Sequence, residues 1–446
     1  MRLLLVNPPT LSKNLHPLPP AGPAYIASFV RQHGFEVNIL DAANLGLDHA
    51  EALARIQTAK PDVVGISVVS GTHHSAVMLG ELVDEALPDA KVVLGGPHIH
   101  FMYREMMQEH DWIDFCVRGE GEETMLELLW ALERESETAA VRGLVYRRNG
   151  EVVVNQDRPF IKNLDGLPFP ARDLLPMQAY HWRIYGFTRL EDSLVAITAT
   201  RGCPFHCHFC ASSYLWNVQR RRSVENVLDE IGACASEYDI GMLLFPDDLL
   251  LFNEDWAMEL CRGMIERGYD RFKWACTGRP GGISDNVLDW LQKARCRLIM
   301  YGVEFGNQRL LDFCGKKTTL AEIEATIAAT RARGILTMGF FILGYPTETA
   351  QTIEETIEFA SRLKLDFAEF NLAKALPGSP LHDYCVERDL LIDTSDENFN
   401  SVSSQMIRLD AVSSVELRRL YRKALGKTRY SLLGRLKKLK RRLLLH

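Results

Sequence analysis

Short apolar runs alternate with helical patterns along this chain, and this alternation constrains the fold more than any other feature. In the first third it predicts a parallel, doubly wound α/β sheet. The predicted strands are residues 3–6, 37–40, 63–67, 92–94 and 114–117. The predicted helices are residues 24–32, 51–59, 76–86 and 123–134.

Ligands of a doubly wound sheet bind at the carboxyl ends of its strands. The candidate binding residues at these ends are Ser67, Gly95, Gly96 and Glu120. Glycines at such positions allow a ligand to approach the backbone closely. Taken alone, the same residues could equally form tight turns that only connect elements.

A second series of alternating patterns follows a break. Its predicted strands are residues 194–199, 242–245, 272–276, 298–302, 337–343 and 367–372. Helices are predicted between them at 224–236, 256–267, 285–294, 320–332 and 349–363. Six such units indicate a partial or full parallel barrel, in which chemistry takes place at the carboxyl ends of the strands.

The break between the two series contains the proline-rich segment LDGLPFP at residues 164–170. Prolines at this spacing block a regular helix, so the segment is expected to be an ordered linker. We therefore expect a first domain at 1–145, a linker at 146–190, a barrel at 191–390 and a small helical C-terminal region at 391–446.

Composition narrows the class of protein. The chain has 446 residues, of which 47% are hydrophobic and 24% charged, as in soluble globular proteins of more than one domain. The net charge of −7 argues against a partner that is a nucleic acid. No run of 18 apolar residues appears, so no membrane span is predicted and a cytoplasmic location is expected.

Three of the ten cysteines lie together, in the segment TRGCPFHCHFC at residues 200–210. Cys203, Cys207 and Cys210 directly follow the first predicted barrel strand, so they belong to a loop at the reactive end of the barrel. Thiolates at this spacing select zinc or an iron–sulfur cluster. Zinc would need a fourth ligand, which His206 or His208 could supply, whereas three thiolates on a cubane leave one iron free.

The Cys-x3-Cys-x2-Cys spacing, with Phe209 before the last cysteine, resembles the signature of the radical S-adenosylmethionine superfamily. That resemblance implies a [4Fe-4S] cluster on the three cysteines and S-adenosylmethionine on the free iron. An electron, supplied by a donor such as flavodoxin or ferredoxin, would then cleave the sulfonium and leave a 5′-deoxyadenosyl radical. A zinc site is the less favoured alternative.

Later segments are similar to weaker motifs of the same superfamily. The resemblance places Asp247 and Asp248 near the methionyl amine, Glu304 near the ribose and Ile342 on the adenine-contacting strand; it also allows Arg279 to reach substrate or cofactor. Each residue has a structural alternative: the aspartates could cap a helix, and Glu304 could pair with a buried base.

A doubly wound domain ahead of such a barrel resembles the cobalamin-binding class of the superfamily. The segments that carry this likeness are the opening NPP, then GIS, GGPH, GEGE and LPGSP. They imply cobalamin as a third cofactor. The Asp-x-His-x-x-Gly motif that supplies an axial histidine in many cobalamin proteins is absent, although His73, His74, His98 and His100 lie near the predicted crevice.

The resemblance implies methylation of an unactivated carbon, or of a phosphinate phosphorus, in a small-molecule or lipid substrate. In that reaction the radical removes a hydrogen from the substrate and methylcobalamin donates the methyl group. A second S-adenosylmethionine then restores the methylcobalamin. A radical oxidative cyclase or rearrangement enzyme is the first alternative, and a non-catalytic cobalamin sensor is the second. Methylthiolation is disfavoured, because only Cys116 precedes Cys203 and a second cluster would need three cysteines.

The last sixteen residues, 431–446, are basic and amphipathic, with leucines at helical spacing. Such a segment can lie on an anionic bilayer, which would suit a lipid substrate and a membrane-peripheral location. A solvated or domain-docked helix is the more common fate of terminal charged segments.

Overall fold

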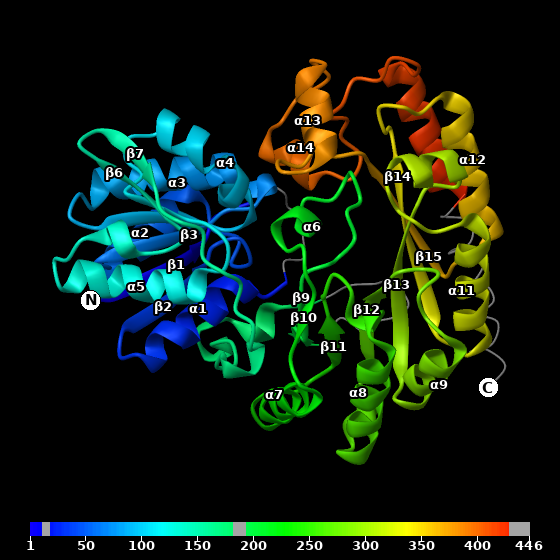
Figure 1. Cartoon of the computed structure of the whole chain (residues 1–446), viewed down its shortest axis with the longest axis horizontal. Helices are drawn as coiled ribbons and strands as arrows, with labels where there is room; N and C mark the ends of the chain where they lie inside the picture. The colour runs from blue at the N-terminus through cyan, green and yellow to red at the C-terminus, as the bar shows by residue number, and fades with distance from the viewer. Residues whose placement is uncertain (11–17, 182–192, 428–446) are drawn as a thin grey trace. The chain divides into compact units, whose positions relative to one another are not determined.

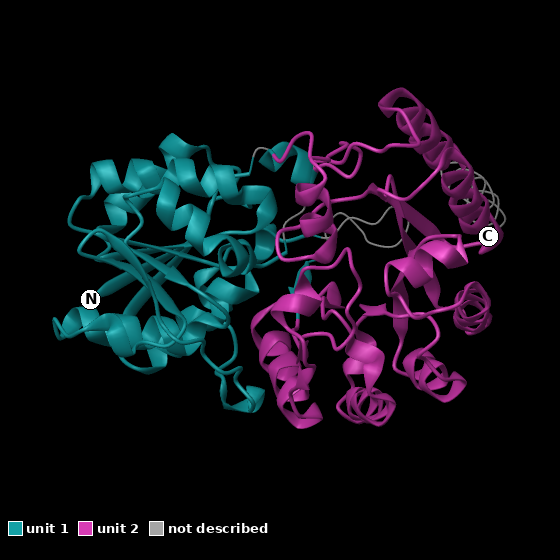
Figure 2. Ribbon diagram, turned by 45° about the horizontal axis from the view of Figure 1, so that its top comes forward, with its two compact units in different colours: residues 1–196, 395–400 teal, residues 197–394, 401–446 magenta. Residues whose placement is uncertain are grey.

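The computed structural model describes residues 1–10, 18–181 and 193–427. The chain divides into two compact units, which Figure 2 distinguishes by colour. Unit 1 comprises Met1–Ala196 together with Ser395–Asn400, and unit 2 comprises Ile197–Thr394 and Ser401–His446.

Unit 1 is built on a seven-stranded sheet with the order β2-β1-β3-β4-β5-β6-β7. Its first five strands are parallel to one another and confirm the predicted doubly wound sheet. They are β1 (Arg2–Asn7), β2 (Glu36–Asp41), β3 (Val63–Ser67), β4 (Lys91–Gly95) and β5 (Phe115–Val117). The chain reverses direction across the sheet between β1 and β3, and ligands of such sheets bind at this switch point.

Helices cover both faces of this sheet (Figure 1). One face packs against α1 (Ala21–Gln32) and α5 (Gly121–Glu133), whose buried side chains include Val30 and Leu129. The other face packs against α2 (His49–Ala59), α3 (His73–Ala86) and α4 (Pro97–Glu109). Both core clusters consist mainly of buried aliphatic residues, so hydrophobic burial on two faces stabilises the parallel strands.

Two strands of this sheet were not predicted. β6 (Leu144–Arg148) pairs antiparallel with β5 and with β7 (Glu151–Val154). The hairpin turns at Asn149 and Gly150, whose φ angles are +54° and +83°. An Asn-Gly pair adopts these angles readily, so this dipeptide was the signal for the hairpin.

Unit 2 contains the second predicted series. A six-stranded sheet has the order β15-β14-β13-β12-β11-β8, and β11 to β15 are parallel. The strands are β8 (Leu194–Ala196), β11 (Met242–Phe245), β12 (Trp274–Gly278), β13 (Cys296–Glu304), β14 (Leu336–Leu343) and β15 (Phe367–Leu372); β8 ends at the last residue of unit 1, and the other five strands belong to unit 2. This sheet confirms the predicted partial barrel.

The strands of unit 2 alternate with helices, as predicted. They are α7 (Val224–Glu237), α8 (Glu254–Glu266), α9 (Asp285–Lys293), α11 (Leu320–Ala332) and α12 (Ala350–Arg362). Along β14, alternate residues such as Phe341 and Leu343 are fully buried, while Met338, Phe340 and Ile342 are partly exposed. Because α11 and α12 pack on this strand, the partly exposed set lies on its other face, toward the barrel interior.

The C-terminal region is helical, as predicted. The described part of the predicted region 391–446 contains α14 (Asp396–Asn400) and a helix at residues 414–427, and α13 (Pro380–Glu387) precedes its predicted boundary. The predicted basic amphipathic segment, 431–446, lies outside the described residues. Within the described ranges, no helix has both the length and the hydropathy needed to cross a bilayer.

Candidate cofactor sites

The cysteine loop of unit 2 is held in place by its own backbone. It begins at β9 (Thr200–Arg201), which pairs antiparallel with β10 (Arg220–Arg221). The amide of Cys203 donates to the Trp216 carbonyl at 3.0 Å, and the amide of Cys210 donates to the Cys207 carbonyl at 3.0 Å. These bonds fix the loop before any ligand binds.

Glycine is required at the start of this loop. Gly202 has a φ of +92°, and a Cβ there would lie 2.9 Å from the Trp216 carbonyl oxygen. The strand can therefore turn sharply into the cysteines only with glycine at this position.

All three thiols lie in low-dielectric surroundings. Cys207 is buried, and Cys203 and Cys210 are partly buried. Burial raises the pKa of Cys203 to about 11, and the charges of Asp248 and the other two thiols add to the rise. Burial also raises the pKa of Cys210. Only thiolates are metal ligands, so a metal bound at this loop would have to lower these pKa values.

The spacing of the sulfurs argues against zinc. Four thiolates around one zinc lie about 3.8 Å apart, from a Zn–S bond of about 2.3 Å. Among the described residues, the one set of three His, Cys, Asp or Glu side chains with ligand atoms all within 4.8 Å of one another is His73, His74 and Asp396. The three loop thiols do not form such a set, so the loop does not bring all three sulfurs as close together as a single zinc requires.

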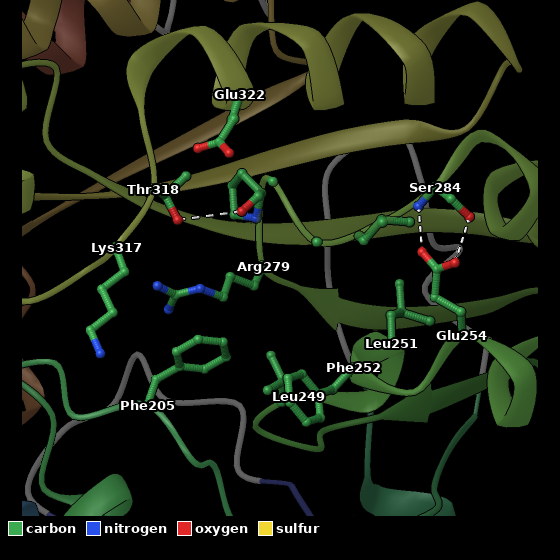
Figure 3. Close-up of a pocket in the computed structure, with 14 residues that line it drawn as sticks. Phe205, Leu249, Leu251, Phe252, Glu254, Arg279, Ser284, Lys317, Thr318 and Glu322 are labelled. Carbon is green, nitrogen blue, oxygen red and sulfur yellow. Dashed lines mark hydrogen bonds between the residues drawn. The ribbon is translucent and has the colours of Figure 1, made fainter.

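Two neighbouring elements reach Cys207. The Nη1 atom of Arg279, just after β12, donates to Cys207 Sγ at 3.8 Å, and the carbonyl of Gly315 lies 4.0 Å from the same sulfur. Arg279 and Phe205 also line a cavity of about 650 Å³, shown in Figure 3. Phe205 and Gly315 were not singled out from the sequence, because neither has a motif of its own.

The two aspartates after β11 have different surroundings. Asp247 is 2% exposed, and its Oδ1 accepts from the amides of Ala199 (2.9 Å) and Thr200. Its Oδ2 is buried without a hydrogen-bond partner among the described residues, and burial raises its pKa to about 7. Asp248 is exposed and accepts from Ser212 Oγ at 2.6 Å. Asp248 is the one whose charge acts on Cys203 and Cys210.

Glu304 forms a buried ion pair at the end of β13. Its carboxylate lies 2.8 Å from Lys316 Nζ, and its φ of +68° is rare for a residue with a side chain. A Cβ on Gly302 would lie 2.8 Å from Lys316 Nζ, so this glycine makes room for the pair. Lys316, which belongs to no motif that would select it, also lies 6.0 Å from the ring centroid of Phe209.

The turn after β14 contains a buried acid. Glu348 is 0% exposed, and its Oε2 accepts from the Tyr345 amide at 2.9 Å. Burial raises its pKa to about 8, and its Oε1 has no hydrogen-bond partner in the described ranges. Ile342 lies on β14 just ahead of this turn, on the partly exposed face.

In unit 1 the ends of β3 and β4 approach each other closely. The amide of Val68, after Ser67, donates to the Gly95 carbonyl at 2.7 Å. Gly96 has a φ of +107°, and a Cβ there would lie 2.6 Å from the Val68 carbonyl oxygen. Gly96 therefore allows the backbone after β3 and the backbone after β4 to lie in close contact.

Two buried acids near these strand ends already accept hydrogen bonds from other groups of the protein. Glu120 is buried, and its Oε2 accepts from the Ile161 amide at 2.7 Å. Asp41, at the end of β2, accepts from Asn7 Nδ2 at 2.7 Å and from the Tyr180 hydroxyl. Asp41 and Tyr180 were not predicted, since a lone Asp and a lone Tyr carry no sequence signal.

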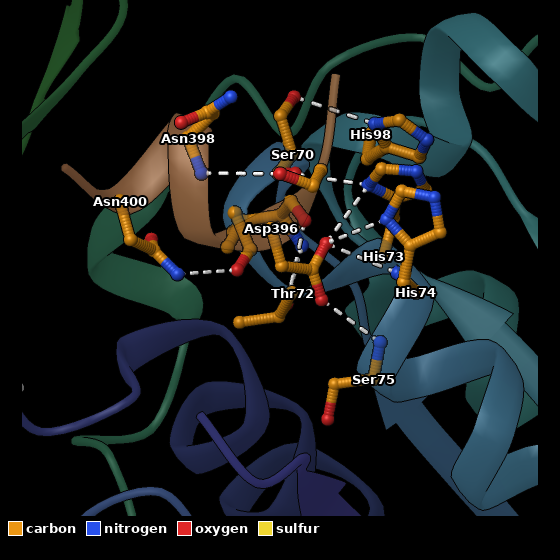
Figure 4. Close-up of polar contacts among 12 residues, drawn as sticks. Ser70, Thr72, His73, His74, Ser75, His98, Asp396, Asn398 and Asn400 are labelled. Atoms are coloured by element: carbon orange, nitrogen blue, oxygen red, sulfur yellow. Dashed lines mark hydrogen bonds and ion pairs between the residues drawn. The ribbon is translucent and has the colours of Figure 1, made fainter. Parts of the chain in front are cut away.

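Three of the four histidines near the crevice, His73, His74 and His98, belong to one polar network, shown in Figure 4. Asp396 of α14 accepts from the Ser75 amide at 2.8 Å and lies 3.1 and 3.2 Å from Nδ1 of His73 and His74. The His73 ring stacks on that of His98, with centroids 4.7 Å apart. His100 Nδ1 instead accepts from the Gly119 amide at 3.2 Å, and burial lowers its pKa.

Comparisons with known proteins match both units of the chain. Two family models match, one described as the B12 binding domain over residues 11–129 and one as the radical SAM superfamily over residues 197–360. An uncharacterized methyltransferase of Pyrococcus horikoshii is 33% identical over 429 residues, covering 95% of this chain and 91% of that protein. The chain belongs to the cobalamin-binding radical SAM family.

Other relatives share both parts. The anaerobic magnesium-protoporphyrin IX monomethyl ester cyclase of Rubrivivax gelatinosus is 30% identical, covering 90% of this chain and 71% of that protein. The radical SAM methyltransferase TsrM of Kitasatospora setae, solved with cobalamin and a [4Fe-4S] cluster bound, has the same fold with a TM-score of 0.70. It is 21% identical, with 94% of this chain and 81% of that chain covered.

This family membership confirms several predictions. The protein is a radical SAM enzyme of a methyltransferase family, with S-adenosylmethionine, a [4Fe-4S] cluster and cobalamin as cofactors. The residues present suit these groups. The cysteine loop offers three thiols on one segment, and glycines stand at the ends of β3 and β4, where a cofactor could approach the backbone.

Proposed function

We propose that this enzyme methylates an unactivated carbon of a small-molecule or lipid substrate, with Cys203, Cys207 and Cys210 as the ligands of its cluster. The observation that carries the proposal is the placement of three thiols on one pre-formed loop after β8, in a chain that also has a cobalamin-type sheet. When bound, the cluster supplies an electron to S-adenosylmethionine, and cobalamin carries the methyl group.

The chain's own residues would bind and orient the reactants. Asp248 is exposed beside the thiols and would accept the methionyl ammonium. The buried pair of Glu304 and Lys316 would fix the strand end against which the adenosyl part lies, with Phe209 and Ile342 as apolar contacts. In unit 1, Ser67, Gly95, Gly96 and the Glu120 region would form the cobalamin surface.

The partly exposed face of β14 supports an apolar substrate. Met338, Phe340 and Ile342 follow one another on this face, so a substrate carbon without an activating group could lie against them. Overall, the substrate C–H and two molecules of S-adenosylmethionine, with two electrons, would give the methylated product, 5′-deoxyadenosine, methionine and S-adenosylhomocysteine. A flavodoxin- or ferredoxin-type protein would supply the electrons.

A labelling experiment tests the methyl transfer. The reconstituted enzyme, supplied with cobalamin, reductant and S-adenosylmethionine carrying a deuterated methyl group, would be incubated with small-molecule and lipid fractions. Mass spectrometry should detect products that carry one labelled methyl group. Labelled product that appears equally with the Cys207→Ala variant would contradict the proposal.

A radical oxidative cyclase is the second candidate, and the similarity to the Rubrivivax cyclase favours it. The same incubation separates the two reactions. A cyclase would consume S-adenosylmethionine and release 5′-deoxyadenosine, but its product would carry no deuterium.

The basic segment at 431–446 supports a further part of the proposal, which is contact with an anionic membrane. Full-length protein should sediment with vesicles that contain anionic lipid, and a variant that ends at residue 430 should not. Equal sedimentation of both proteins would rule out the tail as the membrane contact.

A further inference from the structure

Arg279 connects β12 to the cysteine loop by two separate contacts. Its Nη1 donates to Cys207 Sγ at 3.8 Å. Its guanidinium carbon also lies 3.8 Å from the centroid of the Phe205 ring, in the segment between Cys203 and Cys207. Figure 3 shows the guanidinium of Arg279 beside this ring. The aromatic stack therefore holds the cation in position to donate to the sulfur.

No carboxylate among the described residues forms an ion pair with Arg279 within 4.0 Å, although the charges of Glu322 and Arg279 act on each other at longer range. The Nη2 atom of Arg279 is buried without a hydrogen-bond partner in the part of the chain that the structure describes. Glu322 lines the same cavity, but its carboxylate accepts from the amide and hydroxyl of Thr319. An arginine remains charged at any physiological pH. Cys207 thus receives a hydrogen bond from a full positive charge, which the low local dielectric strengthens.

A donor to a cluster thiolate acts on the cluster's reduction. The reduced cluster carries one more negative charge than the oxidised one, so a nearby cation and an N–H donor stabilise the reduced form more. Hydrogen bonds to the sulfurs and local charge are among the factors that set the potential of iron–sulfur clusters. A higher potential makes the one-electron reduction, in which an external donor is oxidised, easier to complete.

We infer that Arg279 raises the reduction potential of the cluster by donating to Cys207 Sγ, and that Phe205 keeps it in position. Arg279 is therefore a positioning and tuning residue for electron entry. This inference rests on the proposed function, because it takes Cys207 as a cluster ligand. The inference assigns Cys207 as the partner of Arg279, whereas the sequence motif around Arg279 identifies no partner.

The test is an EPR-monitored reductive titration of the reconstituted holoenzyme, with dithionite as the reductant. Arg279→Gln removes the charge and should shift the midpoint potential to more negative values. Arg279→Lys keeps the charge but loses the planar stack, and should give a smaller shift. Phe205→Leu leaves the arginine but removes the ring that holds it, and should also shift the potential negatively.

Lys317→Gln is the matched control. Lys317 is exposed and lines the same cavity, so this variant removes one positive charge without removing a donor to sulfur. It should leave the potential nearly unchanged. An equal shift in Lys317→Gln and Arg279→Gln would overturn the hydrogen-bond account, because it would show that net charge alone sets the potential.

The outcomes separate this inference from the proposed function. If the wild-type protein assembles no cluster, the proposed function fails. If wild type and Arg279→Gln carry equal iron and the same potential, only the inference fails. If Arg279→Gln loses its cluster, the midpoint potentials of Arg279→Lys and Phe205→Leu test the inference instead. A wild-type potential in both variants would overturn it.

Discussion

Four buried acids, two in each unit, differ in how their carboxylate oxygens are hydrogen-bonded. In unit 1, Asp41 and Asp396 accept hydrogen bonds at both carboxylate oxygens. In unit 2, Asp247 and Glu348 each keep one buried oxygen without a hydrogen-bond partner among the described residues, and burial raises the pKa of both. Buried unsatisfied groups are costly, and they cluster where a ligand completes them.

This difference suggests two ways of binding a cofactor. Unit 1 offers glycine backbone and polar groups that already have partners, which suits a large cofactor held mainly by shape. Unit 2 offers three thiols on one loop and two buried acids that each keep an oxygen without a hydrogen-bond partner among the described residues, which suits a metal cluster and a small polar reactant. Four experiments test this contrast, in order of decreasing expected effect.

The largest effect should come from the thiols. Changing Cys203, Cys207 or Cys210 to Ala should abolish the cluster, because the remaining two thiolates cannot hold it alone. Iron and sulfide content after anaerobic purification checks this. Cys116→Ala, in the core of unit 1, is the control and should keep wild-type iron content. Normal iron in the loop variants would remove the contrast between the units.

Gly96→Ala should be the most damaging single change at the unit 1 surface. A Cβ would lie 2.6 Å from backbone that cannot move aside, at a φ that alanine rarely adopts, so we expect a loss of about 3 kcal/mol and of cobalamin binding. Absorbance titration with cobalamin and thermal unfolding measure both. Gly119→Ala is matched, since Gly119 has a φ of +77° but open space around it, and it should cost only about 1 kcal/mol. Equal losses in the two variants would mean that backbone strain, and not the close approach, matters.

Glu348 should make unit 2 less stable as pH rises. Its pKa is raised from 4.5, the value of a fully hydrated glutamate, to about 8 in the folded chain, so the unfolded chain releases this proton first. The contribution of Glu348 to the free energy of unfolding is therefore greatest below about pH 4.5 and falls between pH 4.5 and pH 8. The fall is about 1.4 kcal/mol for each unit by which the folded and unfolded pKa values differ. Urea unfolding of Glu348→Gln should show a flatter pH profile. Glu358→Gln, at an exposed position of α12, is the control and should keep the wild-type slope; an unchanged slope in Glu348→Gln would contradict the prediction.

Asp396 should make the protein less stable as pH falls, which is opposite to the effect of Glu348, and its effect should be the smallest of the four. Burial acts to raise its pKa, but hydrogen bonds from His73 and the amides of Ser75 and His74 outweigh it and lower the pKa to about 2. The stability that Asp396 contributes is therefore fully present above about pH 3.8 and is lost as the pH falls through about 2. Asp396→Asn should cost about 1 to 2 kcal/mol at neutral pH by chemical unfolding. Asp389 is 99% exposed, so Asp389→Asn is the control and should leave the free energy of unfolding nearly unchanged. An equal loss of stability in both variants would contradict the role of the network.

Much of the fold could be predicted from the sequence, because both βα series bury continuous apolar strands whose pattern is local. The β6–β7 hairpin was not predicted, although Asn149 and Gly150 carried its signal. A strand with polar residues on one side, next to a proline-rich stretch, lacked the apolar pattern of the others.

The site was predictable only where residues are adjacent in sequence. Cys203, Cys207 and Cys210 share one loop, so their spacing was informative. Lys316 and Asp396 act through partners 12 and 322 positions away, and no local pattern records such a contact. Arg279 was singled out, but its bond to Cys207 spans 72 positions and emerges only from the fold.

The most direct test of the account is the yield of 5′-deoxyadenosine after reductant and S-adenosylmethionine are added to the anaerobically reconstituted protein. We predict that wild type and Cys116→Ala form it and that the three loop variants do not. A wild-type protein that carries its full iron content but forms none, or loop variants that form as much as wild type, would contradict the central claim.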